Sequence, residues 1–285
     1  MPSASTLAAL SETSYGKSRI RLVRVTRHGD RHQVRDFTVA VAFEGKYDTS
    51  YTDGDNRDVL PTDTMKNTVY ALAARDGVGE PEPFAQSLGQ HFIERNPKLD
   101  RVIVDVVDHG WSRIAIGDRD HGRAFVGRGP EVRIVQVVTT RRGHEVAAGV
   151  TDLVIMKTSN SAFAGFPRDE FTTLPETRDR LFVTSLTAFW SYGDADVDFA
   201  SVFRSVRTTL LETFAQHDSL SVQHTLFAMG QVVLDTIDVV ERIRLEMPNR
   251  HHLLVDVSRF GMENRNEVFV ATEEPHGLIK ATLSR

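Results

Sequence analysis

The sequence predicts an α+β protein built from two similar halves, each an antiparallel sheet covered on one face by two helices. Segments that alternate apolar and polar residues are typical of antiparallel strands with one buried face. Two pairs of segments carry apolar residues at helical spacing, so each pair has a face to bury against a sheet. The order strands, two helices, strands occurs twice, in halves of roughly 130 to 150 residues, which indicates an internal duplication.

In the first half, strands are predicted over residues 19–27 and 37–43, with the turn at His28-Gly29-Asp30. Thr62 and Asp63 have the residue types of a helix start, and Met65, Val69 and Leu72 follow at helical spacing. A second helix is expected after Pro81-Glu82-Pro83. Further strands are predicted over residues 101–107, 114–116 and 123–126.

In the second half, strands are predicted over residues 132–140, 146–158 and 181–190. Two helices follow, over residues 199–214 and 222–245, because apolar residues recur there on one stripe. Strands are expected again over residues 251–258 and 267–271. We therefore predict domains at residues 1–129 and 130–285, with residues 1–14 as a flexible tail.

Composition excludes several classes of protein. With 40% hydrophobic and 26% charged residues, the 285-residue chain has an ordinary globular composition, and no apolar run reaches the roughly 18 residues of a membrane span. The net charge of −5 and the short basic clusters give no field for nucleic acid. Without cysteine there are no disulfides, thiolate metal sites or cysteine nucleophiles. The N-terminal stretch lacks the basic and apolar regions of a signal peptide, and Leu283-Ser284-Arg285 is no peroxisomal address, so a cytoplasmic location is expected.

Residues 160–180 interrupt the strand pattern with two prolines and the break Gly165-Phe166-Pro167, so they are predicted to form a long ordered loop. Phe163 offers a ring for stacking, and Arg180 offers a planar fork of donors, which together suit a flat anionic ligand. Each residue also has a structural interpretation. A phenylalanine can fill a core, and the arginine can pair with a nearby carboxylate, namely Asp169, Glu170, Glu176 or Asp179.

The sequence of this stretch closely resembles the corresponding sequence of urate oxidases of the prokaryotic type. The resemblance is carried by Thr158-Ser159-Asn160-Ser161 with Phe163, by Arg168-Asp169-Glu170, by Thr172-Thr173-Leu174 and by Glu176-Thr177 before Asp179-Arg180, and it extends from Tyr15 to Lys280. It implies two tandem tunnelling-fold (T-fold) domains per chain, barrels that close between two chains, and a homotetramer of two stacked barrels.

The resemblance also implies the reaction. Urate is oxidised by O2 to 5-hydroxyisourate and H2O2 in purine degradation, without a metal or an organic cofactor. Phe163 would stack on the purine, Arg180 would bind one edge, and Gln223 with the backbone of Val222 would bind the other edge. Asn249 would hold O2 or water above the ring. Without the resemblance, Gln223 is a polar residue at a helix start.

Proton transfer is implied for Lys17, Thr62 and His251, and Thr62 and Asp63 would also contact urate. A threonine hydroxyl is a poor base alone, so a lysine tuned by its neighbours and a histidine would relay its proton. In isolation, Thr62 and Asp63 are helix-capping residues, Lys17 is a surface charge and His251 is a strand histidine. Each site would be assembled from two chains, so a monomer would be inactive.

Two features limit the resemblance. Ala164 stands where relatives carry tryptophan, so the packing behind Phe163 is expected to differ. The pairs His251-His252 and His109/His121 lack a third ligand at metal-binding spacing, so no metal site is expected. Two alternatives stay open, namely another purine- or pterin-binding enzyme of the same fold, or an oligomer that binds urate without reaction.

Overall fold

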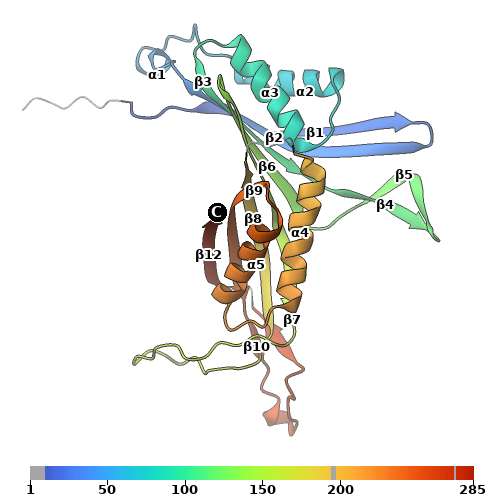
Figure 1. Ribbon diagram of the computed structural model, residues 1–285, viewed down its shortest axis with the longest axis vertical. Helices are drawn as coiled ribbons and strands as arrows, with labels where there is room; N and C mark the ends of the chain where they lie inside the picture. Colours follow the sequence, from blue (N-terminus) through green and yellow to red (C-terminus); the bar gives the residue numbers. More distant parts are fainter. Residues whose placement is uncertain (1–9, 194–196, 273) are drawn as a thin grey trace, which may run out of the picture. The chain divides into compact units, whose positions relative to one another are not determined.

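The computed structural model describes residues 10–193, 197–272 and 274–285 (Figure 1). The chain forms two compact units. The first comprises the described residues up to Gly127 together with Val135–Val146, and the second comprises Arg128–Ile134 and Ala147–Arg285. The predicted domain boundary at residues 129/130 falls inside the short segment Arg128–Ile134. Of the predicted tail, residues 1–9 lie outside the described residues, and residues 10–14 form neither helix nor strand.

The first unit is an antiparallel sheet covered by two helices. Strands β1 (Tyr15–His28), β2 (Arg31–Gly45) and β3 (Leu99–Asp108) pair in that order. Between β2 and β3 lie α1 (Thr49–Thr52), α2 (Thr62–Arg75) and α3 (Pro81–Arg95). Alternate residues of β2 enter the core, and Phe37, Val39, Val41 and Phe43 are each at most 1% exposed. This period of two is what a sheet with one dry face requires.

Two further hairpins complete this part of the chain. Strands β4 (Trp111–Ile116) and β5 (Arg119–Gly127) pair with each other outside the main sheet. Strand β6 (Val132–Thr140) turns into β7 (Gly143–Lys157), and these two strands are divided between the units.

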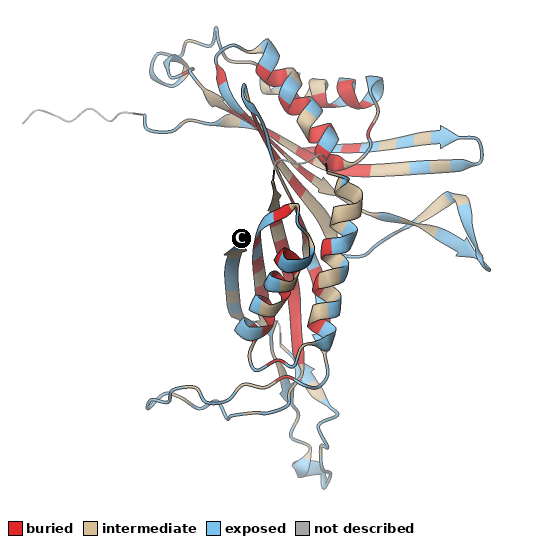
Figure 2. Cartoon of the chain, viewed as in Figure 1, coloured by how far each residue is buried: buried red, intermediate tan, exposed pale blue. Residues whose placement is uncertain are grey.

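The second unit repeats the plan of the first. Strands β7, β8 (Phe182–Tyr192), β9 (Val240–Arg250) and β12 (Gly277–Ser284) are neighbours in that order, and α4 (Phe199–Gln216) and α5 (Val222–Thr236) lie side by side on one face (Figure 1). Trp190 and Phe182 of β8 contact Phe203 and Phe214 of α4. The residues coloured as buried lie along the strands of the sheet and on parts of the helices (Figure 2). A short hairpin of β10 (His252–Leu254) and β11 (Phe269–Ala271), with the 3-10 turn η1 (Ser258–Phe260), lies outside the main sheet.

The predicted α+β class with antiparallel sheets and two long helices per half is confirmed, but several boundaries differ from those predicted. The helix predicted over residues 222–245 ends at Thr236, and β9 begins at Val240. Val240 and Ile243 fit a helical spacing, yet Ile243, Leu245 and Met247 also alternate, and burial on the sheet decides for a strand. The strand predicted over residues 251–258 shortens to β10. Helix α1 and strand β12 were not predicted.

A matching bulge in β1 and β7 supports the internal duplication. A Cβ on Gly16 would lie 2.0 Å from the Val41 carbonyl oxygen, and one on Gly149 would lie 2.3 Å from the Ala188 carbonyl oxygen. Three residues further on, Arg19 and Asp152 each have a φ of 58°, and the strand register shifts there. Bulges of this kind re-aim the side chains beside them. Among the described helices, none is long and apolar enough to cross a membrane.

Candidate active site

The predicted residues of the first unit lie where β1 runs beside the start of α2. The Leu60 amide donates a hydrogen bond of 3.0 Å to the Tyr15 hydroxyl, and the Tyr70 hydroxyl donates one of 3.2 Å to the Arg21 carbonyl. Lys17 lies between these two ties, directly before the bulge, and is half-exposed. The strand therefore places Lys17 along the first turns of α2.

Thr62 opens α2 after Pro61, whose extended backbone precedes the helix, and no side chain caps this end. The first amides of the helix thus lack intrahelical partners and give this end a positive character. Within the described residues the Thr62 hydroxyl has no hydrogen-bond partner, and the side chain is half-buried. The structural interpretation of Thr62 as a side-chain cap is therefore wrong.

Asp63 is held by its own helix. Lys66 Nζ donates to Asp63 Oδ1 at 2.5 Å, and Asn67 Nδ2 donates to Oδ2 at 2.9 Å. The hydrogen bond from Lys66 is the largest cause of a lowered Asp63 pKa, and the positive charge of Lys17 adds to it. The structure therefore brings Lys17, Thr62 and Asp63 together at one end of α2.

In the second unit, two sets of backbone hydrogen bonds fix the segment that carries Phe163. Its amide and carbonyl both pair with Thr177, at 2.8 and 3.0 Å, across the base of the loop. The preceding segment pairs with the turn before α5, through hydrogen bonds from the Ala162 amide to the Ser219 carbonyl at 2.7 Å and from the Ser219 amide to the Asn160 carbonyl at 3.0 Å. The loop that carries Phe163 is thus fastened to the segment that leads to Val222 and Gln223.

Phe166 is a residue of this site that sequence reasoning missed. Its ring stacks on Phe163 with centroids 4.9 Å apart and planes 16° apart, after the chain turns at Gly165, which has a φ of 75°. Ala164 is exposed and leaves the support of Phe163 to Phe166. The available signal was an aromatic residue directly after a loop glycine.

Arg180 is a charged residue at the end of the loop whose side chain is half-buried and lacks an ion-pair partner among the described residues. Its guanidinium carbon lies 5.3 Å from the centre of the Phe163 ring. The side chain is half-buried, burial lowers its pKa, and the Nε atom is buried without a hydrogen-bond partner. No described carboxylate pairs with it. Asp169 instead accepts from the Phe171 amide at 3.0 Å, and Glu176 accepts from the Gly165 amide at 3.1 Å.

The start of α5 provides further backbone donors in the second unit. Ser221 caps the helix, and its side chain accepts from the His224 amide at 3.1 Å. The amides of Val222 and Gln223 belong to the first turn, which has no intrahelical acceptors for them. Val222 is buried, whereas Gln223 is exposed and its side-chain amide has no hydrogen bond within the described residues.

Asn249 and His251 lie at the end of β9. Asn249 is opposite Thr184 of β8 and Gly277 of β12, and directly opposed residues share a face of the sheet. Thr184 is completely buried, and its hydroxyl has no partner. The carbonyl of His251 accepts from the Thr272 amide at 2.9 Å, which fixes the backbone as the chain leaves the sheet. Thr184 is a second residue that sequence reasoning missed.

The other histidine pair considered from sequence has ordinary partners. His109 Nε2 is 2.8 Å from the Thr38 hydroxyl, and His121 Nδ1 accepts from the Arg123 amide at 3.1 Å. Across the described ranges, no three His, Asp or Glu side chains converge as a metal site would require.

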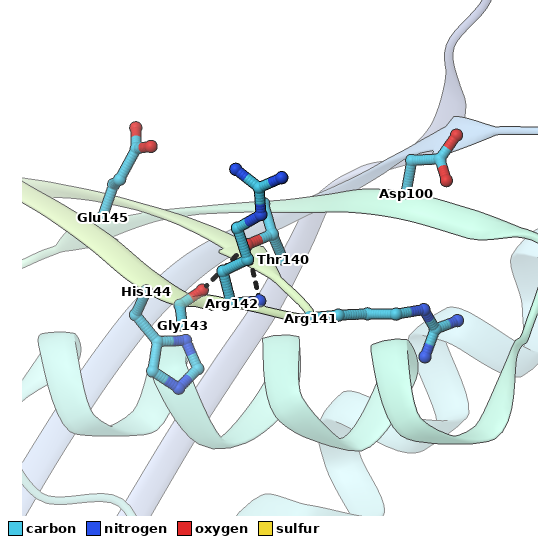
Figure 3. A pocket seen from close by; sticks show the side chains of 7 residues that line it. All are labelled: Asp100, Thr140, Arg141, Arg142, Gly143, His144 and Glu145. Atoms are coloured by element: carbon cyan, nitrogen blue, oxygen red, sulfur yellow. Dashed lines mark hydrogen bonds between the residues drawn. The ribbon is translucent and has the colours of Figure 1, made fainter.

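A hollow in the first unit contains none of the predicted residues. Figure 3 shows it at the turn between β6 and β7, where it is lined by Asp100, Thr140, Arg141, Arg142, Gly143, His144 and Glu145. Arg141 reaches the end of α3 and donates to the carbonyls of Ile93, Asn96, Pro97 and Leu99 at 3.1 to 3.4 Å. Ile93 and Asn96 belong to the end of α3, and Pro97 and Leu99 lead into β3, so Arg141 joins the β6–β7 turn to this connection.

The fold is that of an α+β protein with antiparallel sheets in two units, and Phe163 and Arg180 lie together in the second unit. The sequence model of the Uricase family matches residues 13–138 and 146–280. The chain is 41% identical over 283 residues to the uricase of Arthrobacter globiformis, covering 99% of this chain and 92% of that protein, and 38% identical over 282 residues to the uricase of Dictyostelium discoideum, covering 98% of each. The chain belongs to the uricase family.

Solved structures agree. The crystal structure of the Arthrobacter globiformis uricase matches with a TM-score of 0.94 at 41% identity, over 98% of this chain and 96% of that one. A urate oxidase structure from Bacillus sp. TB-90 matches with a TM-score of 0.85 at 21% identity, and at this identity the match supports only the fold. The predicted fold class, two tandem T-fold domains, is confirmed by these matches.

Proposed function

We propose that this protein oxidises urate with O2 and water to 5-hydroxyisourate and H2O2, using no metal or organic cofactor. The observation that carries the proposal is Arg180, a half-buried guanidinium with an unpartnered Nε beside the ring of Phe163. A buried donor without a partner costs free energy unless a ligand supplies the acceptor. Urate is a flat purine anion whose oxygen and nitrogen atoms provide such acceptors.

The second unit supplies the binding groups. Urate stacks on the face of Phe163 opposite Phe166, and Arg180 donates to one edge of the purine. Gln223 pairs with the other edge, because a carboxamide offers one donor and one acceptor in the pattern that a purine edge presents. The amide of Val222, free at the helix start, adds a further donor. Asn249 holds O2 or the attacking water.

The first unit supplies the proton-transfer groups. Urate loses two electrons and O2 gains them with two protons, and one water adds to the ring, so urate, O2 and H2O become 5-hydroxyisourate and H2O2. Thr62 passes the proton, Lys17 accepts it, and His251 of the second unit completes the relay. Thr62 has an unpartnered hydroxyl at a helix start, where the amides stabilise negative charge.

We further propose a homotetramer in which each site takes Lys17, Thr62 and Asp63 from one chain and the remaining groups from another. Support comes from the strand order, because β1 and β12 are the terminal strands and carry unpaired edges. Open edges of this length require pairing or cover, and pairing between chains would close the sheets into barrels. Urate degradation in the cytoplasm is the corresponding cellular role.

The test mixes purified, chelator-treated protein with urate and follows three signals together, namely urate absorbance, O2 and peroxide. The expected result is equimolar loss of urate and O2 with formation of H2O2. Activity that requires the return of one specific ion would refute the cofactor-free mechanism and favour a metal-dependent purine or pterin enzyme of the same fold. Urate binding without O2 consumption would favour a non-catalytic binding oligomer. Gln90→Ala on the outer face of α3 provides a control that leaves the proposed site intact.

A further inference from the structure

We infer that Lys66, which no part of the proposed relay uses, is a positioning residue that keeps Asp63 occupied and so leaves Lys17 free to exchange its proton. The inference rests on the proposed function, in which Lys17 is the proton acceptor for Thr62. It is carried by the two hydrogen bonds that Asp63 receives from its own helix, from Lys66 Nζ at 2.5 Å and Asn67 Nδ2 at 2.9 Å.

The geometry places one carboxylate between two lysines. Asp63 is in the first turn of α2, and Lys66 and Asn67 follow at the i+3 and i+4 positions, which lie on the same helix face. Lys17 approaches the same end of α2 from β1, between the Tyr15–Leu60 and Arg21–Tyr70 ties. Within the described residues Lys17 forms no ion pair, whereas Lys66 does.

The hydrogen bonds that hold Asp63 determine whether its carboxylate can pair with Lys17. A lysine paired with a carboxylate holds its proton more tightly. Lys66 and Asn67 bind the two oxygens of Asp63, so this carboxylate is engaged by its own helix and forms no ion pair with Lys17. A proton acceptor needs an amine that is not held in such a pair.

The surroundings of Lys17 contain few other charges that could produce the same effect. On its own strand, Tyr15 is tied to Leu60 and Arg19 turns at the bulge. On β2 its register partner is the apolar Val41. On α2 the titratable groups along this stretch are Asp63, Lys66 and Tyr70, and the Tyr70 hydroxyl is tied to the Arg21 carbonyl. Among these groups Asp63 is the one carboxylate, and Lys66 is the cation bonded to it.

The test measures proton loss by Lys17 without using the reaction. Trace acetic anhydride is applied over a pH series to the intact protein, and mass spectrometry follows acetylation of the Lys17 peptide. We expect Lys66→Gln to move the labelling midpoint of Lys17 to higher pH by about 0.5 unit, the size that an exposed ion pair supports. Lys66→Arg should retain the original midpoint. In Lys66→Gln with Asp63→Asn, the freed carboxylate is absent, so the midpoint should return toward that of the unmodified protein.

The matched control is Arg75→Gln, which removes a cation paired with Asp76 at the far end of α2. Nine residues separate it from Lys66, about 13 Å along a helix axis, which is beyond the screening length at physiological salt. In the active protein, Lys66→Gln should also move the acidic limb of kcat/KM to higher pH, with urate affinity under anaerobic conditions unchanged. An unmoved Lys17 midpoint in Lys66→Gln, or an equal movement in Arg75→Gln, would overturn the inference. Absence of urate oxidation by the unmodified protein would instead refute the proposed function.

Discussion

Replacing Arg180 by methionine should affect stability and ligand binding in opposite directions. The change keeps an unbranched side chain over Phe163 but removes the guanidinium and its unpartnered Nε. An unsatisfied buried donor costs about 1 to 3 kcal/mol, and the half-exposed position of Arg180 favours the lower end. Its removal should therefore leave the melting temperature of the ligand-free protein unchanged or raise it by about 2 to 4 °C, the effect of roughly 1 kcal/mol on a domain of this size.

Urate binding should weaken in the same variant. A hydrogen bond to a charged group contributes about 1.5 to 3 kcal/mol, so the dissociation constant for urate should rise about 10- to 150-fold. The measurement is calorimetric titration with urate in the absence of O2, paired with thermal unfolding of the free protein. Without O2 the ligand is not consumed, so the titration reports binding alone.

Arg141→Met is the matched control, because Arg141 donates to four carbonyls at the end of α3 and belongs to no proposed site. We expect it to lower the melting temperature and to leave urate affinity unchanged. The reasoning on Arg180 would be refuted if Arg180→Met destabilised the free protein as Arg141→Met does while urate bound with its original affinity. Arg180 would then be a structural residue.

Four further outcomes are expected. Phe166→Leu should raise the KM for urate about two- to tenfold, since a stacked aromatic pair contributes about 0.5 to 1.5 kcal/mol, and an unchanged KM would remove Phe166 from the site. Thr62→Ala should lower kcat and Gln223→Ala should weaken anaerobic urate binding; the reverse pattern would exchange their roles. The free energy of unfolding should decrease as the pH drops below about 6.5, because burial lowers the pKa of His91, His144 and His217 and the unfolded chain therefore takes up protons first. In His144→Gln, the melting temperature should decrease less steeply with falling pH. Co-expressed Thr62→Ala and Arg180→Ala chains should regain about a quarter of the wild-type sites in mixed oligomers, and mixed oligomers without activity would show that each site belongs to one chain.

The sequence predicted most of the fold because burial and periodicity agree along most of the chain. They conflict after α5, where Val240 and Ile243 satisfy both a helical and a strand spacing, and only packing on the sheet decides between them. Strand β12 is half-exposed along its length and carries a weak apolar signal, so it was missed.

Within the site, residue types indicated Phe163 and Arg180, but the support from Phe166 and the unpaired hydroxyl of Thr184 depend on folding. Phe166 reaches Phe163 only because Gly165 turns the chain. Thr184 becomes notable only because it is completely buried opposite Asn249. For Phe166 the sequence offers only an aromatic residue after a loop glycine, and for Thr184 it offers no signal.

The two halves of the duplicated chain carry different functional residues, those around Lys17 and Thr62 in the first unit and those around Phe163 and Arg180 in the second. Strands β1 and β7 both bend at a glycine and a bulge, yet the residue after the glycine is Lys17 in β1 and Val150 in β7. The first unit places its polar residues at the start of the first of its two long helices, α2, and the second places them at the start of its second long helix, α5. The groups are therefore not copies of one site. One offers a lysine, an unpartnered hydroxyl and a held carboxylate, which suit proton transfer, and the other offers an aromatic ring, a guanidinium and free amides, which suit binding of a flat anion. The proposed oxidation of urate uses both kinds of group, which is why the complementation of Thr62→Ala by Arg180→Ala chains is a direct test of that proposal.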